Sequence, residues 1–178
     1  MNRQVDTNRD GRDERWVESV FGRIWNGGGG NMFSGDHVFM RDDFFRLLDL
    51  EIKRARRYQN LFGVLKFELD DRRSKGTRSQ GRNLKSVLKL LREEVRETDV
   101  VGQTKKNEIM ILLPYCDSPG SEIVYARLSS LIRDFHFGDD ELKIHSGFAC
   151  FPTEGIDMTE ILNKLATHEI NGSVGGTN

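Results

Sequence analysis

The sequence of 178 residues lacks the features that mark secreted, membrane-spanning and strongly nucleic-acid-binding proteins. It has only two cysteines, Cys116 and Cys150, which lie far apart and in no metal-binding spacing, so we expect two reduced thiols. No apolar run approaches the ~20 residues that span a bilayer, and the N-terminus lacks the apolar core of a signal peptide. A net charge of only -1 removes the general electrostatic argument for nucleic-acid binding. We therefore expect a soluble, cytoplasmic protein.

The N-terminal segment differs in pattern from the rest of the chain. Residues 1–11 are polar, and residues 12–25, RDERWVESVFGRIW, carry one apolar stripe at helical spacing. The stripe consists of Trp16, Val17, Val20, Phe21, Ile24 and Trp25. Because so short a helix is marginal in water, the stripe needs a surface to cover, either on the main domain or on a partner protein. Acidic residues share the polar face with arginines, which argues against a role on a membrane surface.

A glycine run separates this predicted helix from the remainder of the chain. Residues 26–31 read NGGGGN, and four consecutive glycines specify no structure, so we expect a flexible tether. The tether is either a natural hinge or an engineered linker that joins a partner's peptide to its receptor. Beyond it we expect a main domain over residues 41–171 and a flexible tail over residues 172–178.

From residue 41 onward the hydrophobic pattern predicts a regular succession of helices and strands. A helix at 41–60 presents Phe44, Leu47, Leu48 and Ile52 on one face. The further expected elements are a strand at 61–69, a polar loop at 70–83, a helix at 84–97, a hairpin of strands at 99–104 and 108–114, a helix at 120–135, a strand at 141–152 and a helix at 158–170. This order predicts an α+β fold in which helices pack on a mostly antiparallel sheet.

Several strings in this region resemble the GGDEF domain family, the diguanylate cyclases that condense two GTP molecules into cyclic di-GMP. The family's first helix and strand are similar to LEIKRARRYQNLFGVLKFELD, and its signature hairpin is similar to LREEVRETDVVGQTKKNEIMILLP. A later helix and strand of the family are similar to RLSSLI and IHSGFACFP. The resemblance covers residues 42–170 and implies the palm-like fold of nucleotide cyclases, with a mostly antiparallel sheet flanked by helices.

The resemblance also implies that the metal site of a cyclase is incomplete. With ILLP as the reference, the family's Gly-Gly-Asp/Glu-Glu-Phe motif falls on Lys105, Lys106, Asn107, Glu108 and Ile109. The glycines of that motif let the backbone approach the substrate, and its third residue is a carboxylate that holds Mg²⁺. Here the third residue is Asn107, a weak ligand, while the other metal carboxylate falls on Glu68, with Asp70 two residues later. We expect no metal site and no catalytic residue.

The loop that recognises guanine in the family is altered as well. The family places an Asn, a Gly-His and a Gly-Asp after its first strand. This chain has Gly76 at the Asn position, no Gly-His and about four residues too few, so no donors or acceptors stand in register with a guanine edge. Cyclase activity is therefore not expected, and the two lysines of the signature are expected to lie in a solvated turn.

One ligand-binding feature of the family is retained. Its inhibitory site, Arg-x-x-Asp, binds cyclic di-GMP, and RETD places Arg96 and Asp99 at the family's spacing from the signature. A second arginine of that site falls on Arg127, and Arg92 and Lys105 could add attraction for phosphate. The alternative is structural: an arginine in the last turn of a helix, an aspartate that makes a turn, and a solvated arginine on the next helix.

The remaining polar residues indicate no further site. The four histidines, His37, His136, His145 and His168, have no metal-binding spacing. The basic cluster KRARR at 53–57 is expected to be a solvated face of the first helix, with an acidic partner or nucleic acid as the alternative.

Two functional hypotheses follow. The first is a catalytically inactive GGDEF-like scaffold that docks an amphipathic helix in a bacterial signalling assembly, with the aromatic residues of the N-terminal stripe as anchors. The second is a cyclic di-GMP receptor that uses Arg96, Asp99 and Arg127. Both predict a protein partner and no cofactor, and both leave a homodimer open.

Overall fold

The computed structural model describes residues 38–70, 77–135 and 143–167, which belong to a compact unit that begins at Gly35. The N-terminal stripe from Trp16 to Trp25, the glycine run and residues 168–178 lie outside these ranges, as do Gly76 and three of the histidines. The predictions for those segments therefore stay predictions.

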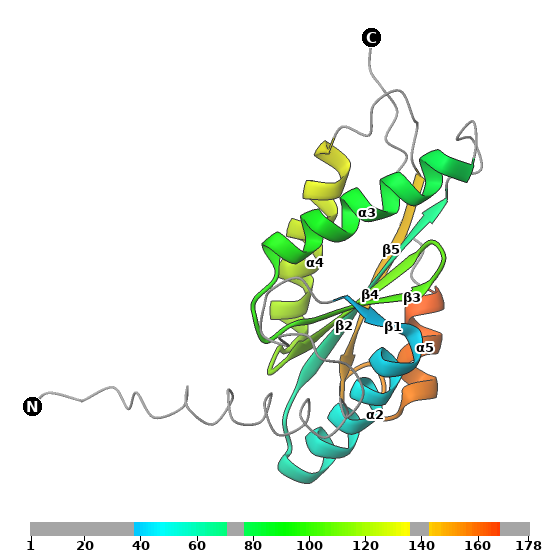
Figure 1. Ribbon diagram of the computed structural model, residues 1–178. Helices are drawn as coiled ribbons and strands as arrows, with labels where there is room; N and C mark the ends of the chain where they lie inside the picture. The colour runs from blue at the N-terminus through cyan, green and yellow to red at the C-terminus, as the bar shows by residue number, and fades with distance from the viewer. Residues whose placement is uncertain (1–37, 71–76, 136–142, 168–178) are drawn as a thin grey trace, which may run out of the picture. The chain divides into compact units, whose positions relative to one another are not determined.

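Five strands and four helices make up the described part of the chain (Figure 1). In order they are β1 (Phe39–Met40), α2 (Arg41–Tyr58), β2 (Phe62–Asp70), α3 (Thr77–Glu94), β3 (Val100–Lys105), β4 (Glu108–Pro114), α4 (Ser118–Asp134), β5 (Lys143–Phe151) and α5 (Met158–Thr167). The strands form one sheet in the order β1-β3-β4-β2-β5, and each described pair is antiparallel except β1 with β3. The predicted α+β class and element order are confirmed, and β1 is an addition.

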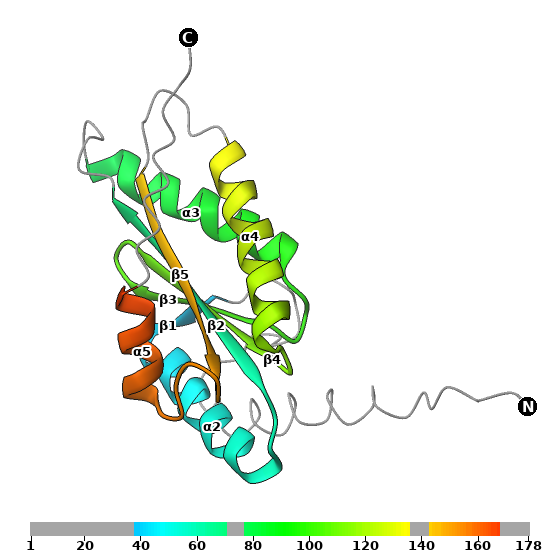
Figure 2. The ribbon, with the colours of Figure 1, turned by 180° about the vertical axis from the view of Figure 1, so that it is seen from behind.

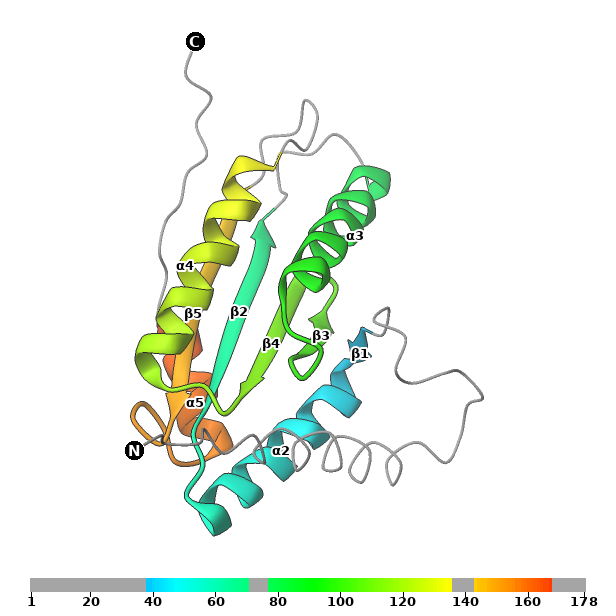
Figure 3. The same ribbon diagram turned by 90° about the vertical axis from the view of Figure 1, so that its left-hand side faces the viewer.

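Helices cover both faces of this sheet. α3 and α4 lie on one face, which is turned toward the viewer in Figure 3, and α2 and α5 lie on the other (Figure 2). Successive side chains of a strand point to opposite faces, so Leu65, Phe67 and Leu69 of β2 join the core under α3 and α4. The residues between and after them, Lys66, Glu68 and Asp70, point to the opposite face and form part of a polar cluster at the end of β2.

Helix α2 forms with the amphipathic face that its sequence predicts. Phe44, Leu47, Leu48 and Ile52 are all buried, acidic residues occupy its first turn, and Arg56 and Arg57 its last, which suits the helix dipole. Phe44 packs so closely on β3 that a Cβ at Gly102 would lie 2.5 Å from its ring, so this contact requires a glycine.

Helix α3 begins earlier than predicted, because Thr77–Gln80 and the residues up to Asn83 are helical rather than part of a polar loop. Leu84, Val87, Leu88 and Leu91 anchor the helix in the core, and once a helix is nucleated each added residue costs little. The polar residues at its start can therefore extend the helix, even with Gly81 among them. The segment between β2 and α3 shrinks to residues 71–76, which lie outside the described ranges.

Candidate functional site

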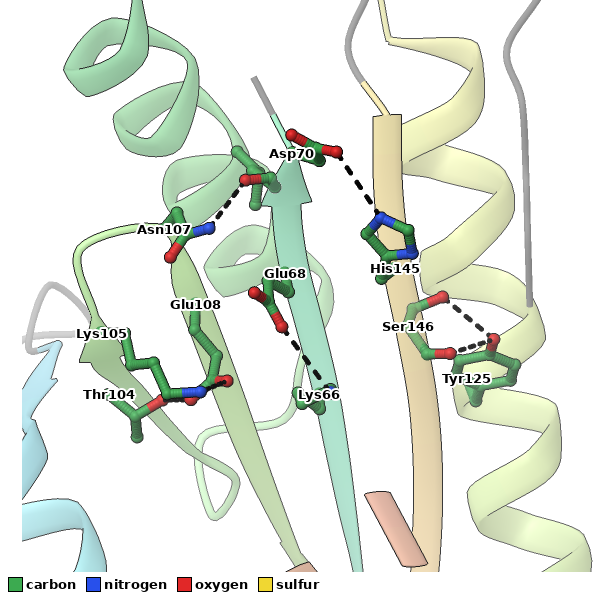
Figure 4. A network of polar contacts seen from close by, with 11 residues as sticks. Lys66, Glu68, Asp70, Thr104, Lys105, Asn107, Glu108, Tyr125, His145 and Ser146 are labelled. Carbon is green, nitrogen blue, oxygen red and sulfur yellow. Dashed lines mark hydrogen bonds and ion pairs between the residues drawn. The ribbon is translucent and has the colours of Figure 1, made fainter. Parts of the chain in front are cut away.

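The signature residues lie at one end of the sheet, where β3 and β4 form the predicted hairpin. The two strands are antiparallel, with a register shift between Gln103 and Lys105, and the turn exposes Lys106. Asn107 follows in the turn, and Glu108 begins β4 directly opposite Glu68 of β2. The structure thus brings together the residues that the family resemblance assigned to the metal site (Figure 4).

Asn107 is fastened to the end of β2 by two hydrogen bonds. Its side-chain Nδ2 donates to the carbonyl oxygen of Leu69 at 3.0 Å, and the Leu69 amide donates to the Asn107 backbone oxygen at 2.8 Å. The side chain is partly buried, so its donated bond is shielded from water. A carboxylate could not make this contact, because it has no proton to donate to a carbonyl group.

Glu108 is buried, and both of its carboxylate oxygens are engaged. Thr104 Oγ1 donates to Oε1 at 2.7 Å, and the Lys105 ammonium lies 2.6 Å from Oε2. Both lysines of the turn are exposed, as predicted, but the Lys105 ammonium is also paired with Glu108. Lys105 supplies the positive charge that a buried carboxylate needs.

The other acidic residues at this end are more loosely paired. The Lys66 ammonium lies 3.8 Å from Glu68, and His145 Nε2 lies 3.9 Å from Asp70 (Figure 4). Within residues 38–70, 77–135 and 143–167, no three His, Cys, Asp or Glu side chains gather in an arrangement that could hold a metal ion. The donor set that remains at the signature does not fit the Mg²⁺ site of a cyclase.

The second candidate site lies at the other end of β3. Asp99 precedes that strand and forms a turn with Arg96: the Arg96 amide donates to Asp99 Oδ2 at 2.9 Å, and the Asp99 amide donates to the Arg96 carbonyl at 3.0 Å. Burial raises the pKa of the Asp99 carboxyl to about 6, although the charges of Arg96 and Arg127 act in the opposite direction. The three predicted residues are thus close enough to interact.

Arg127 of α4 is not merely solvated, as the structural alternative supposed. Its guanidinium donates to the carboxylate of Glu94 at 3.1 Å and to the Glu94 carbonyl at 2.8 Å, so it caps the C-terminal end of α3. Arg96 lies beyond that helix, which ends at Glu94, so its predicted place in the last turn is wrong. Lys105 lies at the far end of β3 from Asp99, a distance of about 20 Å along a strand, and adds nothing to this site.

The basic cluster at 53–57 is a largely exposed face of α2, as predicted, except that Arg54 is partly buried, and three of its side chains have partners within the chain. Lys53 pairs with Asp49 at 2.6 Å, and Arg56 donates to the Ile156 carbonyl at 2.6 and 3.1 Å. Arg54 makes a double hydrogen bond to Glu51, at 3.0 and 2.9 Å. The intramolecular partners leave little support for the alternative of nucleic acid.

The Arg54 contact includes two residues that sequence reasoning missed. Glu51 is fully buried, and desolvation raises the pKa of its carboxyl, while the adjacent guanidinium lowers it. The other side of Arg54 faces Tyr115, whose hydroxyl accepts a bond of 2.6 Å and whose ring centroid lies 4.6 Å from the guanidinium carbon. The pairing of Glu51 with Arg54 follows from helical spacing, but Tyr115 is remote in sequence and gave no signal.

The cysteines and the helices agree with the expectations from composition. Cys116 and Cys150 are both free thiols, and burial raises the pKa of Cys150. Among the described helices, none has the length and apolar character that crossing a bilayer demands.

Solved structures share this fold at low sequence identity. A DGC protein from Thermotoga maritima superposes with a TM-score of 0.65 at 17% identity, over 76% of this chain and 98% of that one. The active GGEEF domain of a diguanylate cyclase from Vibrio cholerae gives a TM-score of 0.65 at 12% identity, over 73% and 87%. The cyclase SiaD of Pseudomonas aeruginosa, in complex with its activator SiaC, gives 0.67 at 16% identity, over 89% of this chain and 63% of that one.

A match to a family model is more specific than this likeness of fold. No curated protein matches the chain at a significant level. The model described as the GGDEF domain of diguanylate cyclases, however, matches residues 37–169, which is most of the chain. The matched range contains the whole described sheet and the signature hairpin. On this evidence the chain belongs to the GGDEF domain family.

Proposed function

We propose that this GGDEF domain has no cyclase activity and acts through contacts with proteins. The observation that carries the proposal is the hydrogen bond from the Asn107 side chain to the Leu69 carbonyl oxygen, at 3.0 Å. A carboxylate oxygen in that position would lie against another oxygen and would need a cation between them. The Asn107 side-chain amide instead donates its own proton to the Leu69 carbonyl oxygen, and no cation is needed there.

The neighbouring carboxylates support the same conclusion. The buried Glu108 carboxylate is paired with the Lys105 ammonium and accepts a hydrogen bond from Thr104, so a metal ion would have to displace these partners to reach it. Glu68 has the Lys66 ammonium within 3.8 Å, a second positive charge that opposes a cation. Phosphoryl transfer depends on Mg²⁺ to neutralise the phosphates, so the pairing of these carboxylates with lysines supports the proposal that the domain is not a cyclase.

Two considerations support a role in protein contacts. The solved complex of SiaD with its activator SiaC is an example of a GGDEF-fold protein that binds a protein activator. In this chain the predicted amphipathic helix at 12–25 carries three aromatic residues, Trp16, Phe21 and Trp25, which are the side chains that anchor many interfaces. We therefore propose that the domain docks an amphipathic helix within a bacterial signalling assembly.

The test is an amide-to-acid substitution. Asn107→Asp places two oxygens in contact, so we expect a loss of about 1–3 kcal/mol of unfolding free energy, recovered when Mg²⁺ or Mn²⁺ is added. The parent protein should show no such metal dependence. The matched control is Gln103→Glu in the same hairpin, because Gln103 also donates to a carbonyl, that of Lys105 at 3.2 Å, but from an exposed position. Melting temperatures with and without each metal give the comparison.

Activity must be measured on the same samples. The parent, incubated with GTP and Mg²⁺, should release pyrophosphate no faster than its Asn107→Ala variant. Faster release by the parent would overturn the proposal that it is not a cyclase. If Asn107→Asp is as stable as the parent and its melting temperature does not change with added metal, the Asn107 amide does not take the place of a metal ion.

A second candidate function is reception of cyclic di-GMP. It is favoured by the proximity of Asp99 to both Arg96 and Arg127, whose charges act on its carboxyl group. Against it, Arg127 is already bound to Glu94. Calorimetric titration with cyclic di-GMP tests it: heat that disappears in Arg96→Ala but not in Arg133→Ala, an exposed arginine later on α4, would support a receptor. No heat at high micromolar ligand would exclude it.

A further inference from the structure

We propose that four exposed apolar side chains, here called the tyrosine surface, form a docking site for an acidic segment of a partner protein, in which apolar side chains lie between carboxylates. The surface consists of Leu50, Tyr58, Leu61 and Tyr115. The inference rests on the proposed function in one respect, namely that the domain acts through contacts with proteins. It adds the location of the contact and the chemical class of the partner segment.

The tyrosine surface lies at the end of the sheet opposite the signature hairpin, where α2 ends and β2 begins (Figure 3). Leu50 is 38% exposed, Tyr58 62%, Leu61 41% and Tyr115 47%. Leu50 and Tyr58 are separated by about 12 Å along α2, with Arg54 midway between them. Phe62 pairs with Pro114, so the neighbours of this pair, Leu61 and Tyr115, lie at the same end. Arg54 joins the two halves through its contact with Tyr115.

The ring of Tyr115 is held in position at the cost of backbone strain. Its φ angle is 54°, in the left-handed region that residues with a Cβ rarely adopt, and that glycine adopts readily. The hydroxyl accepts a bond of 2.6 Å from Arg54, whose guanidinium is itself fixed by two bonds to Glu51. Local strain of this kind is concentrated at functional sites. A ring fixed before binding also loses little entropy when a partner packs on it.

Two arginines give the tyrosine surface a positive rim. Arg46 lies one turn before Leu50 on α2 and Arg57 two turns after it, all on one side of the helix. Both arginines are exposed, and neither forms an ion pair with any residue that the structure describes. The guanidinium carbon of Arg57 lies 5.5 Å from the ring centroid of Tyr58, so this positive charge adjoins the apolar centre.

The charge pattern selects an acidic partner. Two other cations of this part of α2 already have acidic partners, since Lys53 pairs with Asp49 and Arg54 with the buried Glu51. An aromatic and aliphatic centre with charge confined to its rim is the usual composition of a protein interface. Because the uncompensated charges of this rim are positive, complementarity requires carboxylates on the partner, beside the apolar side chains that cover the two rings.

The size of the surface favours a short protein segment over a membrane. A basic residue near an anionic bilayer contributes about 1 kcal/mol, so the two rim arginines would contribute about 2 kcal/mol, which holds a domain on a membrane only weakly. The length of about 12 Å between Leu50 and Tyr58 corresponds instead to about two turns of a partner helix. Apolar residues four apart on such a helix can cover Leu50 and the tyrosine rings together.

Selection from a displayed library of random dodecapeptides tests the proposal, with the full chain as target and its Tyr58→Ser/Tyr115→Gly double variant as counter-target. The double variant should fold, because the backbone at Tyr115 suits glycine and Tyr58 is exposed in the last turn of α2. We expect the peptides enriched on the parent to combine carboxylates with aromatic or aliphatic residues. Equal enrichment on both targets would overturn the proposal, and so would enriched peptides with no excess of acidic over basic residues.

Titrations of the most enriched peptide, labelled with fluorescein and followed by anisotropy, measure the contribution of each residue. The dissociation constant should rise at least about tenfold in Tyr58→Ser and in Tyr115→Gly. It should rise about threefold to tenfold in Arg57→Gln at low salt, and less at high salt, where the charge is screened. Unchanged affinity in both tyrosine variants would overturn the docking site. Unchanged affinity in Arg57→Gln at low salt would overturn the acidic character of the partner.

The matched control is Met40→Ser, which removes an apolar side chain of similar exposure, 65%, from the other end of α2. Met40 is the N-cap residue of α2 and makes no side-chain cap bond, and serine is favoured at such a position, so the variant should fold. It should bind the peptide as the parent does. A loss equal to that of the tyrosine variants would overturn the location of the site.

Two further measurements address other occupants of the tyrosine surface. Sedimentation of the parent with phosphatidylserine and phosphatidylcholine vesicles, lost in Tyr58→Ser and Tyr115→Gly, would assign the surface to a lipid. A sedimentation coefficient that rises with the concentration of the parent, but not with that of the two variants, would assign it to a second copy of the chain. Either result would overturn the proposal, and we expect neither.

These outcomes are independent of the proposed loss of catalysis. The binding measurements use neither GTP nor a divalent metal, and the residues changed lie at the end of the sheet opposite Asn107. A protein that makes cyclic di-GMP but binds acidic peptides at the tyrosine surface would contradict the lack of cyclase activity alone. A protein without activity whose tyrosine variants bind the selected peptide as the parent does would contradict the docking site alone.

Discussion

The two ends of the β2–β4 pair satisfy their charges in the same way but present different surfaces. At the signature end, the polar groups of Asn107 and Glu108 are bonded to Leu69, Thr104 and Lys105, so little hydrogen-bonding capacity is left for a ligand. At the opposite end, Arg54 is bonded to the buried Glu51 beneath the ring of Tyr115, so apolar area is left facing water. Internal pairing thus engages the polar groups at the first end, while at the second it accompanies a half-exposed tyrosine ring.

The largest test of this comparison is the removal of Arg54. Arg54→Met leaves Glu51 fully buried without a counter-charge, and we expect a loss of about 3–5 kcal/mol of unfolding free energy in urea at pH 7. The double variant Glu51→Gln/Arg54→Met should regain most of this loss. Arg57→Met, which removes an exposed arginine of the same helix, is the control. Equal losses in the single and double variants would show that the ion pair is not the cause.

A second test concerns Asp99, whose charge is less fully compensated. Its pKa is raised from 3.8 to about 6 in the folded protein, so the folded state binds this proton more tightly than the unfolded state. The carboxyl group therefore stabilises the fold at low pH, and its contribution is lost as the pH rises from about 4 to about 6. Asp99→Asn should remove this dependence. The difference in unfolding free energy between the variant and the parent should therefore favour the variant by about 2 kcal/mol more at pH 7 than at pH 4.

Urea unfolding at pH 4, 5, 6 and 7 measures the effect as the difference between variant and parent, which cancels the titration of other groups. Glu97→Gln, an exposed acid in the same turn, should show no comparable trend. A difference between Asp99→Asn and the parent that does not change with pH would mean that burial of Asp99 has no consequence for stability.

The smallest test compares two lysines with ion pairs of the same length, 2.6 Å. Lys105→Met leaves Glu108, whose side chain is 5% exposed, with Thr104 alone, and should cost about 1–2 kcal/mol. Lys53→Met breaks a pair with Asp49 whose members are both largely in water, and should cost under about 0.5 kcal/mol. Thermal unfolding of the two variants side by side gives the measurement. Equal losses of unfolding free energy would mean that the Lys105–Glu108 pair is no better shielded from water than the Lys53–Asp49 pair on α2.

Much of the fold follows from the sequence because local patterns and the core agree. The apolar face of α2 and the hairpin around Lys106 were predicted from residues that are neighbours along the chain. The early start of α3 was not, because Thr77 and the polar residues after it are helical only as an extension of a segment held in the core. The proximity of Arg96, Asp99 and Arg127 was implied by the family resemblance rather than by spacing.

By itself the sequence determined the succession of elements, the apolar helix faces and the amide at position 107, since each depends on residue types and their spacing. Only the tertiary structure decided what those residues touch. It set the Asn107 amide against the Leu69 carbonyl, gave Lys105 a buried carboxylate and placed Tyr115 over Arg54, a residue sixty-one positions away. The physical reason is that hydrogen bonds and ion pairs act over a few ångströms in space, whatever the separation along the chain.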